Sequence, residues 1–156
     1  MAATTTSSST SSSTLNEIHL DSPDYVVEFY SGIGGMHYGL QLAHSACRVS
    51  VSMDINTLAN AVYTHNFPDM RVYSRSIEGL KPDDHLINGK QGVRSVMWLM
   101  SPPCQPFSRL GLQRDDQDKR CRSLLHLIDI LPKLLNPPDY ILLENVKGFD
   151  VRVRAE

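Results

Sequence analysis

The sequence of 156 residues lacks any apolar run that could cross a membrane. Its longest uninterrupted apolar stretch is Val96–Met100, whereas a transmembrane helix needs about 20 such residues. Cysteine is scarce: Cys47, Cys104 and Cys121 are the only three, and no two have C-x-x-C spacing. That pattern argues against a disulfide framework and a zinc site, and it favours reduced thiols inside a cell. We expect no metal centre and no membrane contact.

A marked excess of positive charge is also absent, because the formal net charge is −2. Binding to nucleic acid through net charge alone is therefore excluded, although a local basic patch would serve the same purpose. No lysine or arginine precedes Arg48, and residues 1–14 contain eleven serines or threonines. Such a segment has nothing to bury, so we predict a disordered tail over residues 1–24 rather than an organelle transit peptide. The expected location is the cytoplasm, the nucleus or both.

What the sequence does contain is an alternation of strand-like and helix-like segments. Strands are predicted at residues 25–30, 48–53, 71–73, 95–100 and 140–143, and helices at 36–45, 56–66 and 121–135. Asn56 is the expected N-cap of the second helix, and Pro132 should kink or end the third. The runs 95–100 and 140–143 are nearly all apolar, as in strands buried on both faces. The alternation predicts one α/β domain over residues 25–150, with a mostly parallel, Rossmann-like sheet and helices on both faces.

Four motifs fall at the carboxyl ends of predicted strands, where such sheets bind their ligands. The first is the turn Ser31–Gly35, whose glycines let the backbone approach a ligand at the start of a helix. Asp54 ends the next strand, where a carboxylate can accept both hydroxyls of a ribose. The glycines stand at positions 32, 34, 35 and 39, which departs from G-x-G-x-x-G and favours a nucleoside-type cofactor other than a dinucleotide. A tight turn and an Asp helix cap would explain the same residues equally well.

The other two candidate sites hold a cysteine and a glutamate. Cys104 lies in a turn framed by three prolines, and stiff turns hold a nucleophile in place at a modest entropic cost. We expect an accessible nucleophile there rather than a buried structural cysteine. Glu144 follows three apolar residues, so burial should raise its pKa and suit it to act as a general acid beside Asn145. The alternative is a solvated glutamate at a helix start.

Positive charge gathers directly after the cysteine turn. Residues 109–122 contain five basic and three acidic residues, a net charge of +2. A basic loop at this place would cover a polynucleotide, but a solvated loop of mixed charge explains the composition equally well. The histidines at 37, 44, 65 and 126 are expected at the surface or as helix caps rather than as ligands.

Together these motifs resemble those of the cytosine-5 methyltransferases. Residues 29–35 (FYSGIGG) are similar to the family's cofactor loop, 103–105 (PCQ) to its nucleophile signature and 144–146 (ENV) to its acid motif, in the family's order. Longer phrases, including Asn66-Phe67-Pro68 and Ile77-Glu78-Gly79, resemble the branch that methylates aspartate tRNA at an anticodon-loop cytosine with a DNA-methyltransferase scaffold. The resemblance covers about residues 25–150.

The resemblance implies methyl transfer from S-adenosylmethionine to carbon 5 of a cytosine in tRNA, with DNA as the alternative substrate. Cys104 would attack carbon 6 as a thiolate, which makes carbon 5 nucleophilic, while Glu144 would hydrogen-bond ring nitrogen 3 and Asn145 would orient that site. The implied cofactor contacts are Tyr30, Ser31, Gly32, Ile33, Gly34, Gly35, Asp54, Ile77, Glu78, Ser101 and Pro103. The implied nucleic-acid contacts are Gln105, Ser108, Arg109, Arg114 and Arg120.

The sequence departs from the family after Asp150. Residues 151–156 match no family motif, and the family's arginine motif, target-recognition region and C-terminal strands have no counterpart. The strand at 140–143 should then form a bare sheet edge, which invites aggregation. The main alternative function is therefore a non-catalytic remnant that binds cofactor or a partner protein. A nicotinamide-dependent oxidoreductase fits less well, because it gives the cysteine turn no role. The oligomeric state is left open.

Overall fold

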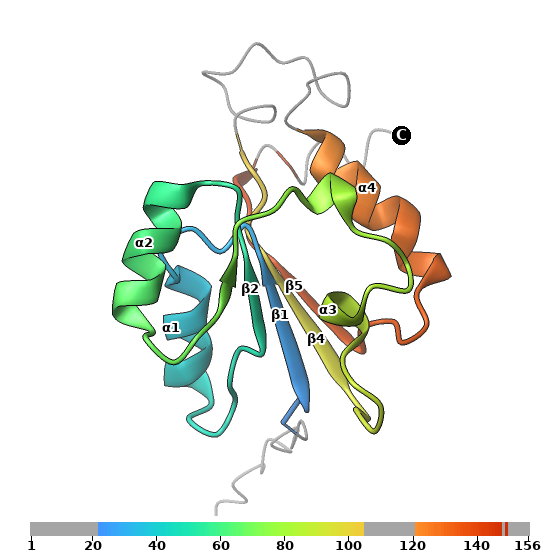
Figure 1. Ribbon diagram of the computed structural model, residues 1–156, viewed down its shortest axis with the longest axis horizontal. Coiled ribbons are helices and arrows are strands. Elements are labelled where there is room, and N and C mark those ends of the chain that lie inside the picture. Colours follow the sequence, from blue (N-terminus) through green and yellow to red (C-terminus); the bar gives the residue numbers. More distant parts are fainter. Residues whose placement is uncertain (1–21, 105–120, 148, 150–156) are drawn as a thin grey trace, which may run out of the picture.

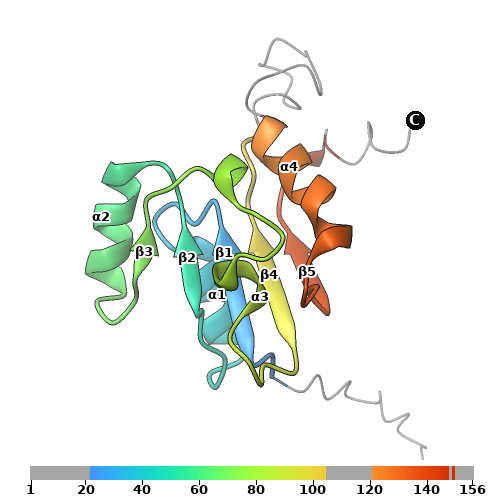
Figure 2. The same cartoon turned by 45° about the vertical axis from the view of Figure 1, so that its right-hand side comes forward.

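A five-stranded parallel sheet forms the centre of the molecule in the computed structural model, which describes residues 22–104, 121–147 and 149. The strand order is β3-β2-β1-β4-β5, and the two views in Figures 1 and 2 show the strands side by side with their carboxyl ends at one edge. The strands are β1 (Tyr25–Phe29), β2 (Val51–Met53), β3 (Val72–Tyr73), β4 (Val96–Met100) and β5 (Tyr140–Leu143). The predicted fold class is confirmed.

Helices cover both faces of this sheet, as Figure 1 shows. On one side lie α1 (Gly35–Ala43) and α2 (Thr57–Asn66), and on the other lie α3 (His85–Asn88) and α4 (Arg122–Ile130). Two short 3-10 helices, η1 (Ile77–Gly79) and η4 (Leu131–Lys133), complete the described part. No helix in the described part is long and apolar enough to span a bilayer.

The central strand β1 divides its side chains between the two faces. Val27 and Phe29 join the larger core cluster, which includes residues of α3, α4 and η1. Val26, on the opposite face, packs with Leu99 and with Leu40 of α1. Such alternation follows from the period of two along a strand, and burial on both faces explains why β1 and β4 are nearly continuous apolar runs.

The local predictions hold at several boundaries. Strand β5 has the predicted bounds, and Asn56 caps α2 by accepting hydrogen bonds from the backbone N–H groups of Leu58 and Ala59. The third helix ends at Ile130, and Pro132 lies in the 3-10 turn that follows. The sequence patterns did not predict η1 or α3, because neither is long enough to show a period. The predicted tails lie outside the described residues except for 22–24.

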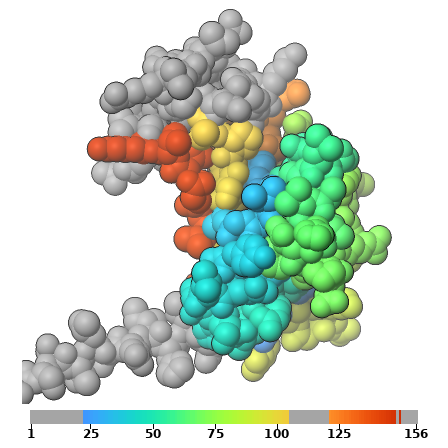
Figure 3. Space-filling view, turned by 90° about the vertical axis from the view of Figure 1, so that its left-hand side faces the viewer, coloured from blue at the N-terminus to red at the C-terminus, as the bar shows by residue number. Residues whose placement is uncertain are grey.

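The expectation that β5 is buried on both faces is wrong. Ile141 is 47% exposed and Leu142 is 52% exposed, because β5 pairs only with β4 among the described residues. Figure 3 shows residues of this segment (red) standing open to solvent on the side where α1 (cyan) covers the neighbouring strands. The predicted exposed sheet edge is therefore present in the described part of the chain.

Candidate active site

A cavity of about 480 Å³ opens at the carboxyl edge of the sheet. Its walls come from the ends of β1, β2 and β4, from the segment around η1 and from the start of α4. The lining residues are Tyr30, Asp54, Ile55, Arg75, Ser76, Ile77, Glu78, Ser101, Pro103 and Ser123. The volume lies within the range of about 300–1,000 Å³ that small-molecule sites occupy. Six predicted cofactor contacts, at positions 30, 54, 77, 78, 101 and 103, therefore share one cavity.

The glycine turn lies between β1 and α1. Gly32 and Gly34 have φ angles of +51° and +96°, in the left-handed region that glycine adopts without steric cost. The turn is closed by a hydrogen bond from Gly34 N–H to the Ser31 carbonyl, at 2.9 Å. The first N–H groups of α1 follow directly. The predicted cofactor contacts Ser31–Gly35 are not among the residues that line the cavity, so their contact with a cofactor stays a prediction.

Asp54 connects this turn to the end of β2. One carboxylate oxygen accepts the Gly32 N–H at 2.9 Å, and the other accepts the Asn56 N–H at 2.8 Å. Each oxygen has a second lone pair, so both remain able to accept a hydroxyl of a ribose. The helix-cap alternative for Asp54 is wrong, because Asn56 is the N-cap of α2 and Asp54 only accepts the N–H of that cap residue.

Tyr30, at the end of β1, has a φ of +55°, which is rare for a residue other than glycine. Its hydroxyl donates a hydrogen bond to Ser123 Oγ on α4 at 3.1 Å. Burial raises the pKa of Tyr30 to about 12, so the phenol stays protonated at neutral pH. Strained backbone of this kind concentrates at functional sites, and here both side chains of the hydrogen bond line the cavity.

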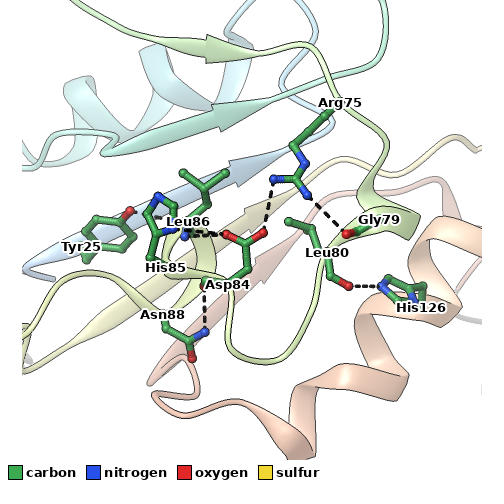
Figure 4. Close-up of polar contacts among 9 residues, drawn as sticks. All are labelled: Tyr25, Arg75, Gly79, Leu80, Asp84, His85, Leu86, Asn88 and His126. Atoms are coloured by element: carbon green, nitrogen blue, oxygen red, sulfur yellow. Dashed lines mark hydrogen bonds and ion pairs between the residues drawn. The ribbon is translucent and has the colours of Figure 1, made fainter.

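The segment that carries the lining residues Ile77 and Glu78 is held by polar contacts of Arg75, which also lines the cavity. Figure 4 shows Arg75 between the Gly79 carbonyl, at 3.3 Å, and the Asp84 carboxylate, at 3.2 Å. Asp84 also caps α3 by accepting the Leu86 N–H at 3.0 Å. Arg75 thereby joins the 3-10 turn to the next helix.

The segment around η1 is also held by a hydrogen bond from α4. The ring Nε2 of His126 donates to the Leu80 carbonyl at 2.9 Å, also drawn in Figure 4. Because a carbonyl only accepts, this ring nitrogen carries its proton. The residues that precede and follow η1 are therefore fixed on two sides.

The cavity suits S-adenosylmethionine in its chemistry. Asp54 offers acceptors for the ribose, and Ile55, Ile77 and Pro103 provide apolar walls of the kind that an adenine ring packs against. The carboxylates of Asp54 and Glu78 put negative charge beside a cationic ligand. The Ser31 hydroxyl, next to the lining residue Tyr30, is buried with no partner among the described residues. The residues present thus fit the group that the motifs imply.

The cysteine turn follows β4 at the same edge of the sheet. Ser101 Oγ donates to Met36 Sδ at 2.9 Å, which fixes the start of the turn on α1. Pro102 is buried, whereas Cys104 is exposed, as predicted for a nucleophile. Cys47 and Cys121 are buried. The described residues contain no group of three or more His, Cys, Asp or Glu side chains that could hold a metal ion.

The acid motif lies beside the cysteine turn. Asn145 Nδ2 donates a hydrogen bond to the Pro102 carbonyl at 3.2 Å, and Glu144 N–H donates to the Met100 carbonyl at 2.9 Å. Strands β4 and β5 are neighbours with Met100 opposite Leu143, so both motifs leave the sheet at the same level. This pairing brings together residues separated by 43 positions in the sequence.

Two expectations about individual side chains are wrong. Glu144 is exposed rather than buried, because the strand that it follows is at the sheet edge. His37 is 1% exposed rather than at the surface, because Glu28 and Tyr63 provide it with buried polar partners.

Several predicted residues are not placed, and several lining residues were not predicted. Gln105, Ser108, Arg109, Arg114 and Arg120 lie outside the described residues. Arg75, Ser76, Ile55 and Ser123 line the cavity without having been predicted. Only the position of Arg75 and Ser76 directly before the Ile77-Glu78-Gly79 phrase could have indicated them, and no sequence signal marks Ser123.

Comparison with known proteins agrees with this geometry. The chain is 51% identical to the mouse tRNA (cytosine(38)-C(5))-methyltransferase over 83% of its own length, and 52% identical to the Dictyostelium discoideum DNA (cytosine-5)-methyltransferase over 80%. It spans 30% of the first relative and 31% of the second. The crystal structure of the S. pombe Dnmt2 methyltransferase matches 81% of the chain, with a TM-score of 0.64 and 37% identity, and the chain covers 35% of that structure.

These identities confirm the predicted resemblance to the tRNA-methylating branch. The family model described as "C-5 cytosine-specific DNA methylase" matches residues 25–152, which include the glycine turn, the cysteine turn and the acid motif. The chain belongs to the C-5 cytosine-specific DNA methylase family.

Proposed function

We propose that this chain binds S-adenosylmethionine and methylates carbon 5 of a cytosine in tRNA through a covalent adduct with Cys104. The observation that carries the proposal is the hydrogen bond from Asn145 to the Pro102 carbonyl, at 3.2 Å. It holds the acid motif against the turn that presents the exposed cysteine. A nucleophile and an acidic group beside one ligand cavity are the parts that this reaction needs.

The cysteine supplies covalent catalysis in the proposed reaction. Cytosine carbon 5 is a poor nucleophile. Addition of the Cys104 thiolate to carbon 6 converts the ring to an enamine, in which carbon 5 is nucleophilic. Glu144 hydrogen-bonds ring nitrogen 3 and stabilises the protonated ring, while Asn145 keeps the acid motif next to the cysteine turn. After methylation, loss of the carbon-5 proton returns an electron pair to the ring and expels the thiolate.

The cavity residues bind and orient the methyl donor. S-adenosylmethionine would supply an electrophilic methyl group. Asp54 accepts the ribose hydroxyls, and Ile77 and Glu78 flank the adenine. The Tyr30–Ser123 hydrogen bond joins the end of β1 to α4 within the lining of the cavity.

A tRNA substrate is supported by the 51% identity to the mouse enzyme, whose name specifies cytosine 38 of tRNA. Aspartate tRNA is the substrate that the motifs imply. Its anticodon-loop cytosine is single-stranded, so moving it into the site costs less than the few kcal/mol needed to flip a stacked duplex base. DNA is the alternative, because a similarly close relative is named as a DNA methyltransferase.

The test is transfer of a labelled methyl group from S-adenosylmethionine. We expect the 156-residue chain to label aspartate tRNA and the Cys104→Ala variant to lose labelling by several orders of magnitude. Cys47→Ala, which removes a buried thiol outside the cavity, is the matched control and should keep activity in proportion to its folded fraction. Labelling that survives in Cys104→Ala would refute the covalent mechanism, and labelling of duplex DNA but not tRNA would refute the substrate.

The alternative is a non-catalytic protein that binds the cofactor without turnover. The chain spans 30% of its mouse relative, so the experiment must measure cofactor binding and turnover separately. Calorimetry distinguishes the two: micromolar binding of S-adenosylmethionine with no labelling of either nucleic acid would support the alternative.

A further inference from the structure

The end of α2 packs against the glycine turn through residues that do not line the cofactor cavity. A Cβ atom added at Gly34 would lie 2.4 Å from Cε2 of Phe67 and 3.2 Å from Cδ2 of Tyr63. Asn66 Nδ2 donates a hydrogen bond to the Ile33 carbonyl at 3.3 Å. The cavity lining includes none of these three α2-side residues. They contact the turn without being available to a ligand in that cavity.

Behind this contact runs a buried chain of hydrogen bonds. The Tyr63 hydroxyl donates to Glu28 Oε2 at 2.7 Å and lies 2.7 Å from His37 Nδ1. Since its only proton goes to the carboxylate, the hydroxyl oxygen accepts from the ring nitrogen of His37. The other ring nitrogen, Nε2, then accepts from the Gln41 amide at 3.2 Å. Burial lowers the pKa of His37, which agrees with a neutral ring in this arrangement.

The chain closes on the backbone of α1. Glu28 Oε1 accepts the His37 N–H at 3.2 Å, in the first turn of the helix. The residue that precedes α1, Gly34, has no side chain to cap it. The carboxylate of Glu28 therefore replaces a capping side chain for this N–H group, and it is itself held by the Tyr63 hydroxyl.

We propose that Tyr63 is a positioning residue for the cofactor turn, acting with Asn66 and Phe67. Its hydroxyl fixes Glu28 and His37, and so fixes where α1 begins; its ring and that of Phe67 set how far Gly34 can move. Asp54 holds Gly32 from the cavity side at 2.9 Å, so the turn is held on both sides. This gives a role to the Asn66-Phe67 part of a sequence phrase to which the mechanism assigns none. The inference rests on the proposed function, because the turn positions a cofactor only if the cavity binds one.

The test compares Tyr63→Phe, which removes only the hydroxyl, with Tyr140→Phe on the sheet edge as the matched control. One measurement is amide hydrogen exchange of the free chain over residues 31–37 and, as an internal reference, over 96–100. The other is the dissociation constant for S-adenosylmethionine by calorimetry. Asn66→Ala, which removes the contact with the Ile33 carbonyl and leaves the buried chain intact, is the second variant.

We expect Tyr63→Phe to speed exchange over residues 31–37 about tenfold more than over 96–100 and to weaken cofactor binding about tenfold, the effect of losing one hydrogen bond to a charged group. Asn66→Ala should act in the same direction but less, and Tyr140→Phe should change neither quantity. Unchanged exchange in the turn, or an equal increase in both segments, would overturn the positioning role. If the unsubstituted chain does not bind S-adenosylmethionine, the proposed function fails, and the exchange comparison alone still decides whether Tyr63 holds the turn.

Discussion

Replacing Gly34 by alanine is the sharpest perturbation of the cofactor turn. The residue has a φ of +96°, and the new Cβ would lie 2.4 Å from Cε2 of Phe67. That ring cannot move aside freely, because it stacks on His37 with centroids 3.8 Å apart and an interplanar angle of 4°. It also contacts Tyr63, whose centroid is 5.0 Å away. The substitution therefore adds a steric clash to a backbone strain.

The two costs can be worked out separately. A non-glycine residue in left-handed backbone costs about 1–2 kcal/mol, and overpacking a close-packed site costs about 1–3 kcal/mol. The free energy of unfolding should fall by about 2–5 kcal/mol in Gly34→Ala, a large part of the roughly 5–15 kcal/mol that holds a typical domain together. Loss of the turn should also weaken binding of S-adenosylmethionine.

Two neighbouring glycines provide graded controls. Gly32 has a φ of +51° but no atom within 4 Å of its added Cβ. Backbone strain alone should therefore lower the free energy of unfolding of Gly32→Ala, by about 1–2 kcal/mol. Gly35 begins α1 and also has open space around it, so Gly35→Ala should be neutral or up to about 1 kcal/mol more stable. Urea unfolding followed by the fluorescence of Trp98, the single and buried tryptophan, measures all three. Equal losses in Gly32→Ala and Gly34→Ala would refute the reasoning, because the approach to Phe67 would then contribute nothing.

Three further predictions concern charge and exposure. Burial raises the pKa of Glu28 to about 7 from 4.5. Between these two pH values the folded chain therefore binds more protons than the unfolded chain. The contribution of this carboxyl to the free energy of unfolding thus declines as the pH rises from 4.5 to about 7. Burial lowers the pKa of His37, which gives the opposite slope, but that slope largely cancels when wild type is compared with Glu28→Gln. Between pH 5 and pH 8 the unfolding free energy of wild type should fall by about 2–3 kcal/mol relative to the variant, and a constant difference would contradict the shift. Arg75→Ala should cost about 1 kcal/mol by urea unfolding, since its ion pair with Asp84 is partly exposed, and Arg75→Lys should recover at most part of it. Leu142→Lys should slow aggregation in light scattering at unchanged stability, because the side chain it replaces is half exposed on the sheet edge, whereas faster aggregation would contradict that role.

The positions of the strands could be predicted from the sequence because apolar and β-branched runs leave few alternatives. Strand β5 was predicted residue for residue, and the turns that follow β1 and β4 were found from glycine and proline. The inward face of α4 was not predicted. Apolar residues at helical spacing include Leu124, Leu125 and Ile128, yet Leu125 and Ile128 are exposed, whereas Leu124, Leu127 and Ile130 are buried. Apolar residues lie around most of this helix, so its docking on the sheet, rather than its own period, decides which face is inside.

Polar residues were harder to interpret than apolar ones. Glu28 lies in a strand that otherwise reads as apolar, and its partners Tyr63 and His37 come from two different helices. No local sequence pattern predicts a buried hydrogen-bond network whose residues are distant in sequence and become neighbours only in the folded chain. The same holds for Ser123, which reaches the cavity through a hydrogen bond with Tyr30, 93 positions earlier. Reading the motifs identified the residues that would touch ligands but not the residues that hold them in place.

Four residue pairs between β4 and β5, from Met97 opposite Tyr140 to Met100 opposite Leu143, set the register in which the cysteine turn meets the acid motif. Slippage of one step along this ladder would displace Glu144 by about 3.3 Å and turn every β5 side chain to the other face of the sheet. An insertion or deletion inside β4 or β5 should therefore be far more harmful than one in the connection 131–139, which can absorb a change in length without altering the ladder. Tolerance to length variation in this family member is thus set by strand pairing as much as by the reacting groups.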